Sequence, residues 1–145
     1  MKVVIQRVKE SKVEIENNIF SKINKGLLVL VGFSNEDNKE KIEWMANKII
    51  GLRIFSDENN KMNLSVKDIN GEILIVSNFT LYGELAKGYR PSFSDAANPE
   101  IAIPLYDYFV KFISNFGIPI KTGIFGAMMD IHLINDGPVT IILEK

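Results

Sequence analysis

The run GLLVLVGF at residues 26–33 constrains the fold most, because it is apolar without interruption. A strand with one wet face alternates apolar and polar residues, so an unbroken run is typical of a strand buried on both faces. A second run, EILIVSNFTLY at 72–82, is also strongly apolar but is interrupted near its end by polar residues. The chain therefore needs further elements to cover both faces of a central sheet.

Two hairpins are predicted, one at each end of the chain. VVIQRV and KVEIE alternate apolar and polar residues around the turn KES, within residues 3–16. Near the C-terminus, DIHLI and VTIILEK flank the hexapeptide NDGPVT at 135–140, where Asp-Gly suits a tight turn. Pro138 is unusual in that place, since it cannot donate to a ladder.

Helices are expected to cover the sheet. Ser34 or Asn35 can cap a helix that runs to residue 52 and places apolar residues at helical spacing. A second helix is predicted to begin at Pro99 and to end before Gly117. At 145 residues the chain fits one domain, residues 1–145, and the fold expected is α/β of the α+β type with a mainly antiparallel sheet.

Composition excludes several classes of function. The 17 basic and 18 acidic residues give a net charge of −1, so any nucleic-acid contact should be confined to a short stretch such as an end. The chain has no cysteine, which excludes disulfides, thiolate zinc sites and cysteine nucleophiles. No apolar run approaches the ~20 residues of a membrane span, and the N-terminus is typical of a strand, so we expect a cytoplasmic protein.

The usual catalytic side chains are scarce. His132 is the only histidine, and alternation places it opposite Ile131 and Leu133 in a strand. A lone strand histidine is more often a surface residue than a general base. Asp130 shares its face, but no serine can be assigned to the pair. No group of residues has metal-ligand spacing, so we expect neither a metal nor a cofactor.

The polar insert at the end of the second apolar run has two interpretations. Ser77, Asn78 and Thr80 stand where the strand should bury apolar side chains. Unpaired buried polar groups cost roughly 1–3 kcal/mol each. The insert is therefore either a strand end with local hydrogen bonds to the backbone or the floor of a ligand pocket.

Two other segments also have two interpretations. GYRPSF at 88–93 places an arginine between two aromatic residues, which suits base stacking or phosphate binding but equally an ordinary loop anchor. Phe125, in KTGIFGAMM, is more typical of a core than of a ligand wall. For Gly137-Pro138 a trans bond is the default. The residues alone give no substrate.

Taken together, VVIQRV, GLLVLVGF, LRIF, SNFTLYG, GYRPSF, FGAMM and NDGPVT resemble the D-aminoacyl-tRNA deacylase family in order and spacing, from end to end. The resemblance implies a barrel-like sheet with two covering helices. It also implies a homodimeric proofreading hydrolase that cleaves the ester of D-aminoacyl-tRNA, and of mischarged glycyl-tRNA, at the acceptor 3′ end. Backbone N–H groups and the 2′-hydroxyl of the terminal adenosine would supply the chemistry, without a metal or cofactor.

The resemblance also assigns residues. Ser77, Asn78, Phe79 and Thr80 would hold the aminoacyl group, although the family usually has glutamine in place of Asn78. Gly137-Pro138 would be a Gly-cisPro tip that enters the partner's active site and rejects L-amino acids sterically.

Three assignments in the resemblance concern supporting residues. Arg7 would brace the tip, and Phe125 and Met129 would flank the terminal adenosine. Two alternatives remain: an esterase or amidase on small substrates with Thr80 or Ser77 as its nucleophile, and a non-catalytic module that binds RNA ends.

Overall fold

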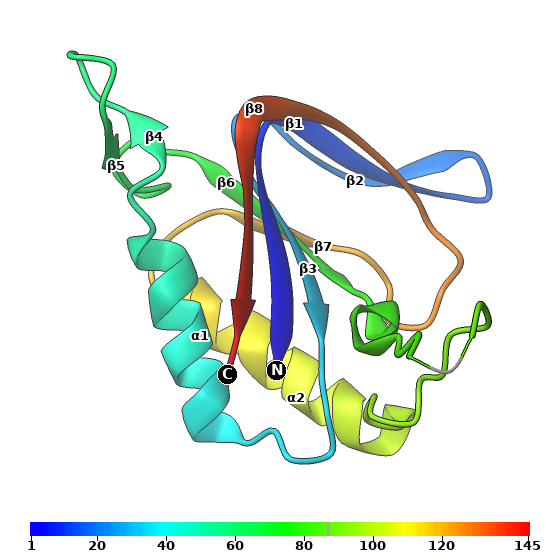
Figure 1. The fold of residues 1–145 in the computed structure, drawn as a ribbon. Helices are drawn as coiled ribbons and strands as arrows, with labels where there is room; N and C mark the ends of the chain where they lie inside the picture. Colours follow the sequence, from blue (N-terminus) through cyan, green and yellow to red (C-terminus); the bar gives the residue numbers. More distant parts are fainter. Residues whose placement is uncertain (87) are drawn as a thin grey trace.

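A mixed sheet of six strands forms the centre of the structure, a computed structural model that describes residues 1–86 and 88–145. The strands are β1 (Lys2–Ile15), β2 (Asn18–Ile23), β3 (Gly26–Gly32), β6 (Glu72–Ser77), β7 (Ile120–Thr122) and β8 (Asp130–Glu144). Their order is β2-β1-β3-β6-β7, with β8 paired to β1 (Figure 1). β1 pairs antiparallel with β2, β3 and β8, whereas β6 is parallel to β3 and β7.

The sheet curls until its two ends nearly meet. Ser21 in β2 donates its hydroxyl to the carbonyl of Thr122 in β7 at 2.8 Å, although these strands lie at opposite ends of the strand order. A small ladder of β4 (Phe55–Ser56) and β5 (Met62–Leu64) projects to one side. The predicted α/β fold with a mainly antiparallel, barrel-like sheet is confirmed.

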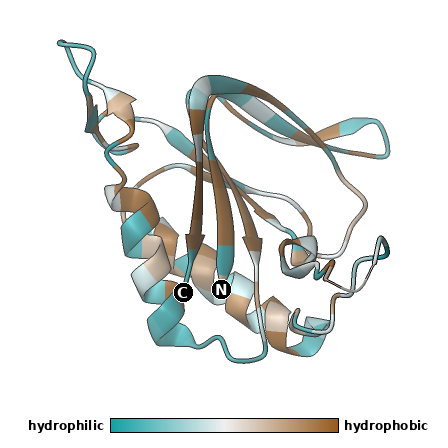
Figure 2. Cartoon of the chain, viewed as in Figure 1, coloured by the Kyte–Doolittle hydropathy of each residue, from teal (hydrophilic) through white to brown (hydrophobic). Residues whose placement is uncertain are grey.

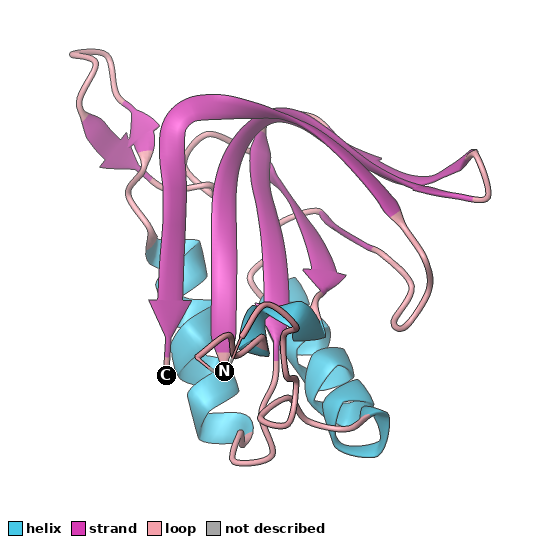
Figure 3. Cartoon of the chain, turned by 45° about the vertical axis from the view of Figure 1, so that its right-hand side comes forward, coloured by secondary structure: helices cyan, strands magenta, loops and turns pink. Residues whose placement is uncertain are grey.

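Two helices, α1 (Lys39–Gly51) and α2 (Pro99–Ser114), pack together on one side of the sheet (Figure 3). α1 begins later than expected, because Asn38 and not Ser34 or Asn35 is its N-cap. Asp37 explains the delay. Its buried carboxylate accepts the N–H of Ser34 and pairs with the amino group of Met1, which holds residues 34–37 in a turn.

The central strands consist mainly of hydrophobic residues (Figure 2). Leu27, Leu28 and Val29 are each no more than 1% exposed, so the unbroken run in β3 is buried on both faces as predicted. Leu27 and Val29 pack in the cluster under the helices, and Leu28 packs in a second cluster inside the curved sheet. In the described part of the chain, neither helix has the length and apolar character needed to cross a bilayer.

The two predicted hairpins do not form. β1 and β8 are single long strands that pair with each other from Lys2–Glu144 to Glu14–Asp130. This long ladder pairs most of the backbone groups of both strands, which two separate hairpins would leave in part unpaired. The register shifts between Gln6 and Val8, whose partners are Thr140 and Asn135. Between these two pairs β1 has one residue and β8 has four, residues 136–139, which are called here the tip and lie at the arch of β8 (Figure 1).

Candidate active site

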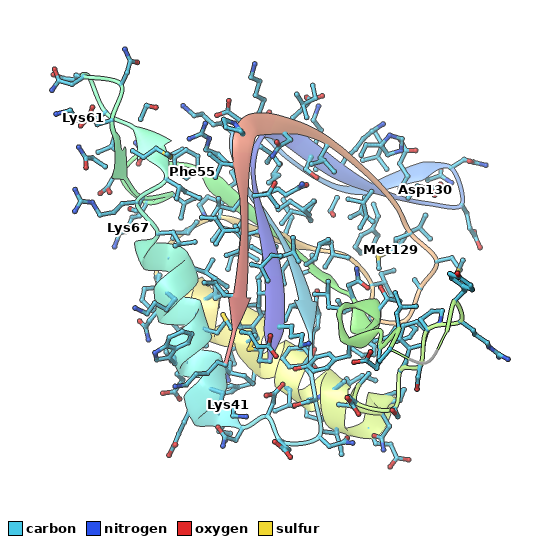
Figure 4. All side chains as sticks on the ribbon, viewed as in Figure 1. Lys41, Phe55, Lys61, Lys67, Met129 and Asp130 are labelled. Carbon is cyan, nitrogen blue, oxygen red and sulfur yellow. The ribbon has the colours of Figure 1, made fainter. Side chains whose placement is uncertain are left out.

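A pocket with a cavity volume of about 770 Å³ lies where β6 ends. It is bordered by the short 3₁₀ helix η1 (Phe79–Tyr82), by the start of α2 and by the loop before β8. Figure 4 labels Met129 on this side of the molecule, away from the β4–β5 ladder that carries Lys61. Six residues singled out from the sequence line the pocket: Ser77, Asn78, Phe79, Thr80, Phe125 and Met129.

The floor of the pocket is a turn whose shape is fixed by Asn78. The N–H of Asn78 donates to the carbonyl of Val31 at 2.7 Å, and its side chain then caps η1. The Asn78 Oδ1 atom accepts from the Thr80 N–H at 3.1 Å and from the Thr80 hydroxyl at 2.5 Å. Gly32 makes room for this turn, since a Cβ there would stand 2.8 Å from the Asn78 carbonyl oxygen. The insert therefore bonds locally and also lines a pocket.

One backbone donor at this turn differs from its neighbours. The N–H groups of Asn78, Thr80, Leu81 and Gly83 each have an acceptor. Within the described residues, the N–H of Phe79 has none. An unpaired N–H beside a pocket can bind the oxygen of a ligand or of a reaction intermediate.

The walls of the pocket are mainly apolar, and their positions follow from close packing. Phe125 packs edge-on against Tyr106 with ring centroids 5.8 Å apart. The hydroxyl of Tyr106 donates to the Ile75 carbonyl at 3.0 Å, and burial raises the pKa of this phenol above its ordinary range. Gly123 allows Met129 to approach, since a Cβ there would lie 2.5 Å from its sulfur. In this way the core itself holds the wall residues in place.

The described residues that line the pocket include no histidine, carboxylate, lysine or arginine. The Thr80 hydroxyl donates its proton to an amide oxygen, which is not a base. His132 does not line the pocket, whereas its neighbour Ile131 does, as the alternation of the strand predicts. The Nε2 atom of His132 lies 3.0 Å from a carboxylate oxygen of Glu14, whose pKa is lowered chiefly by a hydrogen bond from Lys12.

The tip is braced separately from the pocket. Arg7 is only 8% exposed, and its Nε atom lies 3.2 Å from the Asp136 carbonyl oxygen and 2.9 Å from the Asp136 carboxylate. The Asn135 amide donates to the carbonyls of Arg7 and Val139, at 3.1 Å each, and so closes the neck of the tip. A second donor of Arg7 bonds the Ile54 carbonyl. The tip is thus held rigidly against β1.

The tip residues do not line the pocket of their own chain. Neither Gly137 nor Pro138 is among the residues around the cavity, and Arg7 is not among them either. The Gly137-Pro138 bond is cis, as the resemblance implied. No side chain in the described residues donates to the carbonyls of Gly137 or Pro138, whereas those of Asp136 and Val139 have partners. The tip thus offers two backbone acceptors away from the pocket.

The whole chain matches known proteins. A family model described as D-Tyr-tRNA(Tyr) deacylase matches residues 4–144. The chain belongs to this family. A Thermosipho africanus protein named D-aminoacyl-tRNA deacylase is 58% identical over 145 residues, which cover 100% of this chain and 97% of that protein. A Flavobacterium psychrophilum protein of the same name is 59% identical over 146 residues, with the same coverage. The predicted family is confirmed, and with it the class of enzyme, a hydrolase.

Solved structures share this fold. The structure titled c-Myc DNA Unwinding Element Binding Protein has a TM-score of 0.94 and 42% identity, and the match covers 100% of this chain and 99% of that one. A probable eukaryotic D-amino acid tRNA deacylase has a TM-score of 0.83 at 18% identity, covering 98% and 97% of the two chains, and supports the fold.

Several residues around the site were not predicted from the sequence. Ala96, Ala97 and Ala102 form the pocket side contributed by α2 and the residues before it, but alanine carries no chemical signal in a sequence. Phe93 also lines the pocket and packs edge-on against Phe79, with ring centroids 5.1 Å apart. Asn135 was interpreted only as part of a turn, because its contact with the Arg7 carbonyl joins segments that are distant in the sequence.

Proposed function

We propose that the chain hydrolyses the ester bond of D-aminoacyl-tRNA in the cytoplasm, as one domain spanning residues 1–145. Family membership supports the substrate class. The main core cluster contains both Met1 and Val139, which supports a single folding unit. Water adds to the carbonyl carbon of the ester, the bond to the ribose oxygen breaks, and the amino acid leaves as tRNA regains its hydroxyl.

The observation that carries the proposal is a pocket with an unpaired backbone donor and no titratable side chain. The N–H of Phe79 would bind the oxyanion that develops on the ester carbonyl, a contribution of about 3–4 kcal/mol for one such donor. Thr80 would position the substrate. The 2′-hydroxyl of the terminal adenosine would assist the attacking water, because no side chain of the described lining is a base.

The tip would act on the pocket of a second copy of the chain. The carbonyls of Gly137 and Pro138 would accept hydrogen bonds from the α-amino group of a D-amino acid and would crowd an L side chain. Glycine has no side chain to be crowded, so mischarged glycyl-tRNA should also be cleaved. This arrangement makes the active unit a homodimer with two composite sites, each made of one pocket and the partner's tip.

A nucleophilic esterase or amidase is the main alternative. It is less well supported, because the Thr80 hydroxyl bonds an amide oxygen and Ser77 has no base among the described residues that line the pocket. A module that only binds RNA ends would need no oxyanion donor.

Incubation of the purified protein with D-Tyr-tRNA and L-Tyr-tRNA separates these possibilities. The proposal predicts release of tyrosine from the D-aminoacyl substrate alone. Equal release from both substrates would favour the esterase, and binding without release would favour the RNA-end module.

A further inference from the structure

The segment between η1 and α2 carries two exposed side chains that the pocket does not use. Tyr89 is fully exposed and Arg90 is also exposed. Glu84 and Ser92 form an antiparallel bridge, with N–H to carbonyl distances of 2.8 and 2.9 Å in the two directions. Residues 84–86 and 88–92, which this bridge holds together and which are called here the 84–92 hairpin, thus present these two side chains beyond a fixed base.

The base of the 84–92 hairpin is attached to the pocket. Phe93 follows the bridge, lines the pocket and packs edge-on against Phe79. Gly83, which precedes the bridge, lies so close that a Cβ would stand 3.1 Å from the Phe93 ring and 3.7 Å from Pro91. The two aromatic residues of GYRPSF therefore differ: Phe93 is an anchor, whereas Tyr89 is free to contact a partner.

The position and chemistry of this surface suit single-stranded RNA. Only three residue steps separate Tyr89 from Ser92, and even a fully extended chain would span at most about 10 Å over them, so Tyr89 lies a short distance from the pocket wall. An exposed aromatic ring is a stacking surface for any base, and a guanidinium pairs with phosphate. Since the net charge of the chain is −1, a contact with RNA has to be local rather than spread over a basic face.

We propose that the 84–92 hairpin holds the single-stranded 3′ end of the tRNA beside the pocket. Tyr89 stacks on a base, and Arg90 pairs with a phosphate, of the nucleotides that precede the terminal adenosine. The inference rests on the proposed function, because it requires the terminal aminoacyl-adenosine to occupy the pocket.

Two substrates test this surface: D-Tyr-tRNA and the D-tyrosyl ester of adenosine alone. Tyr89→Ala should lower kcat/KM for the tRNA substrate by about tenfold, as loss of one base stack does, and leave the adenosine ester unaffected. Tyr89→Phe should keep the activity. Arg90→Ala should reduce the slope of log kcat/KM against log salt concentration by about 0.7, the value for one phosphate of a single strand, and Arg90→Lys should restore it.

Matched controls lie on the β4–β5 ladder, on the other side of the molecule (Figure 4). Lys61→Ala removes one exposed charge, and Met62→Ala removes an apolar side chain that is 57% exposed. Neither should change kcat/KM on either substrate.

Equal losses on both substrates would overturn the inference, and so would unchanged kcat/KM on D-Tyr-tRNA in both alanine variants. If the wild type does not cleave the adenosine ester, two D-tyrosyl minihelices replace it. Each lacks the base of one of the two nucleotides that precede the terminal adenosine. The Tyr89→Ala loss should vanish on one of them, and persistence on both would contradict stacking. A wild type inactive on D-Tyr-tRNA would instead count against the proposed function itself.

Discussion

Two irregular stretches, the turn 77–80 at the end of β6 and the tip 136–139 within β8, are each held by an asparagine. At the turn, the Asn78 oxygen accepts from Thr80 twice, and the N–H of Phe79 is left without a partner among the described residues. At the tip, the Asn135 amide donates to two carbonyls, and those of Gly137 and Pro138 receive no side-chain donor from the described residues. One stretch thus presents a donor and the other presents acceptors.

The two stretches also differ in their surroundings. The turn lies in a pocket, whereas the tip lies at the arch of β8 and lines no part of that pocket (Figure 1). A rigid, polar loop without a cavity of its own suggests a partner that supplies the cavity. The tip and the pocket lie apart within one chain, and this separation is the physical basis for the proposed homodimer.

Filling the pocket should have the largest effect. Ser77→Trp places a bulky ring where the aminoacyl group would lie, so kcat/KM for D-Tyr-tRNA should fall by at least about 100-fold. Ser77 is at the end of β6 and only partly buried, so the circular dichroism spectrum should stay that of the wild type. A variant that is folded and still active would show that the pocket is not the site of hydrolysis.

Weakening the neck of the tip should have the next largest effect. Asn135→Asp keeps the shape of the side chain but turns two donated hydrogen bonds into contacts between a carboxylate and carbonyl oxygens. Since each unsatisfied group costs roughly 1–3 kcal/mol, we expect kcat/KM for D-Tyr-tRNA to fall about tenfold or more, with weaker discrimination against L-Tyr-tRNA. Asn59→Asp, on an exposed loop, is the control and should change neither. If Asn135→Asp discriminates between D-Tyr-tRNA and L-Tyr-tRNA as well as the wild type does, the tip does not select the chirality of the amino acid.

Removing the Thr80 hydroxyl should have a moderate effect. Thr80→Ala loses one positioning hydrogen bond but no nucleophile, so we expect at least about a tenth of the wild-type kcat to remain. A substrate with a 2′-deoxy terminal adenosine should react far more slowly with the wild type. An inactive Thr80→Ala that still binds substrate, together with rapid cleavage of the 2′-deoxy substrate, would make Thr80 the nucleophile.

Lengthening Asn78 should have the smallest effect on activity. Glutamine is a poorer N-cap, so Asn78→Gln should lower the free energy of unfolding by about 0.5–1 kcal/mol, measured by urea denaturation. Because Asn78 bonds the turn and not the substrate in this account, kcat/KM should change by less than about threefold. A large loss of activity without a loss of stability would indicate direct contact with the substrate.

The sequence predicted those parts of the molecule that depend on local pattern. The unbroken run of β3, the two amphipathic helices and the polar insert at 77–80 all follow from residue spacing. The two terminal hairpins were wrong because alternation identifies a strand but not its partners, and β8, which pairs with β1 along most of its length, lies more than 100 residues away in the sequence. Asn135 and the alanines of the pocket were missed for the same reason, since their roles depend on contacts between distant segments.

The central claim is that the tip of one chain completes the pocket of another. Mixed dimers test this claim. One subunit carries Ser77→Trp, which disables its pocket. The other subunit carries Asn135→Asp, which loosens the neck, and Pro138→Ala, which frees the φ angle that the proline ring fixes. Each parent homodimer should be nearly inactive on D-Tyr-tRNA. Verified heterodimers should recover about half of the wild-type activity per dimer, because one intact pocket receives one intact tip. Heterodimers that remain as inactive as both parents would show that the tip serves its own chain, and the proposed composite site would be wrong.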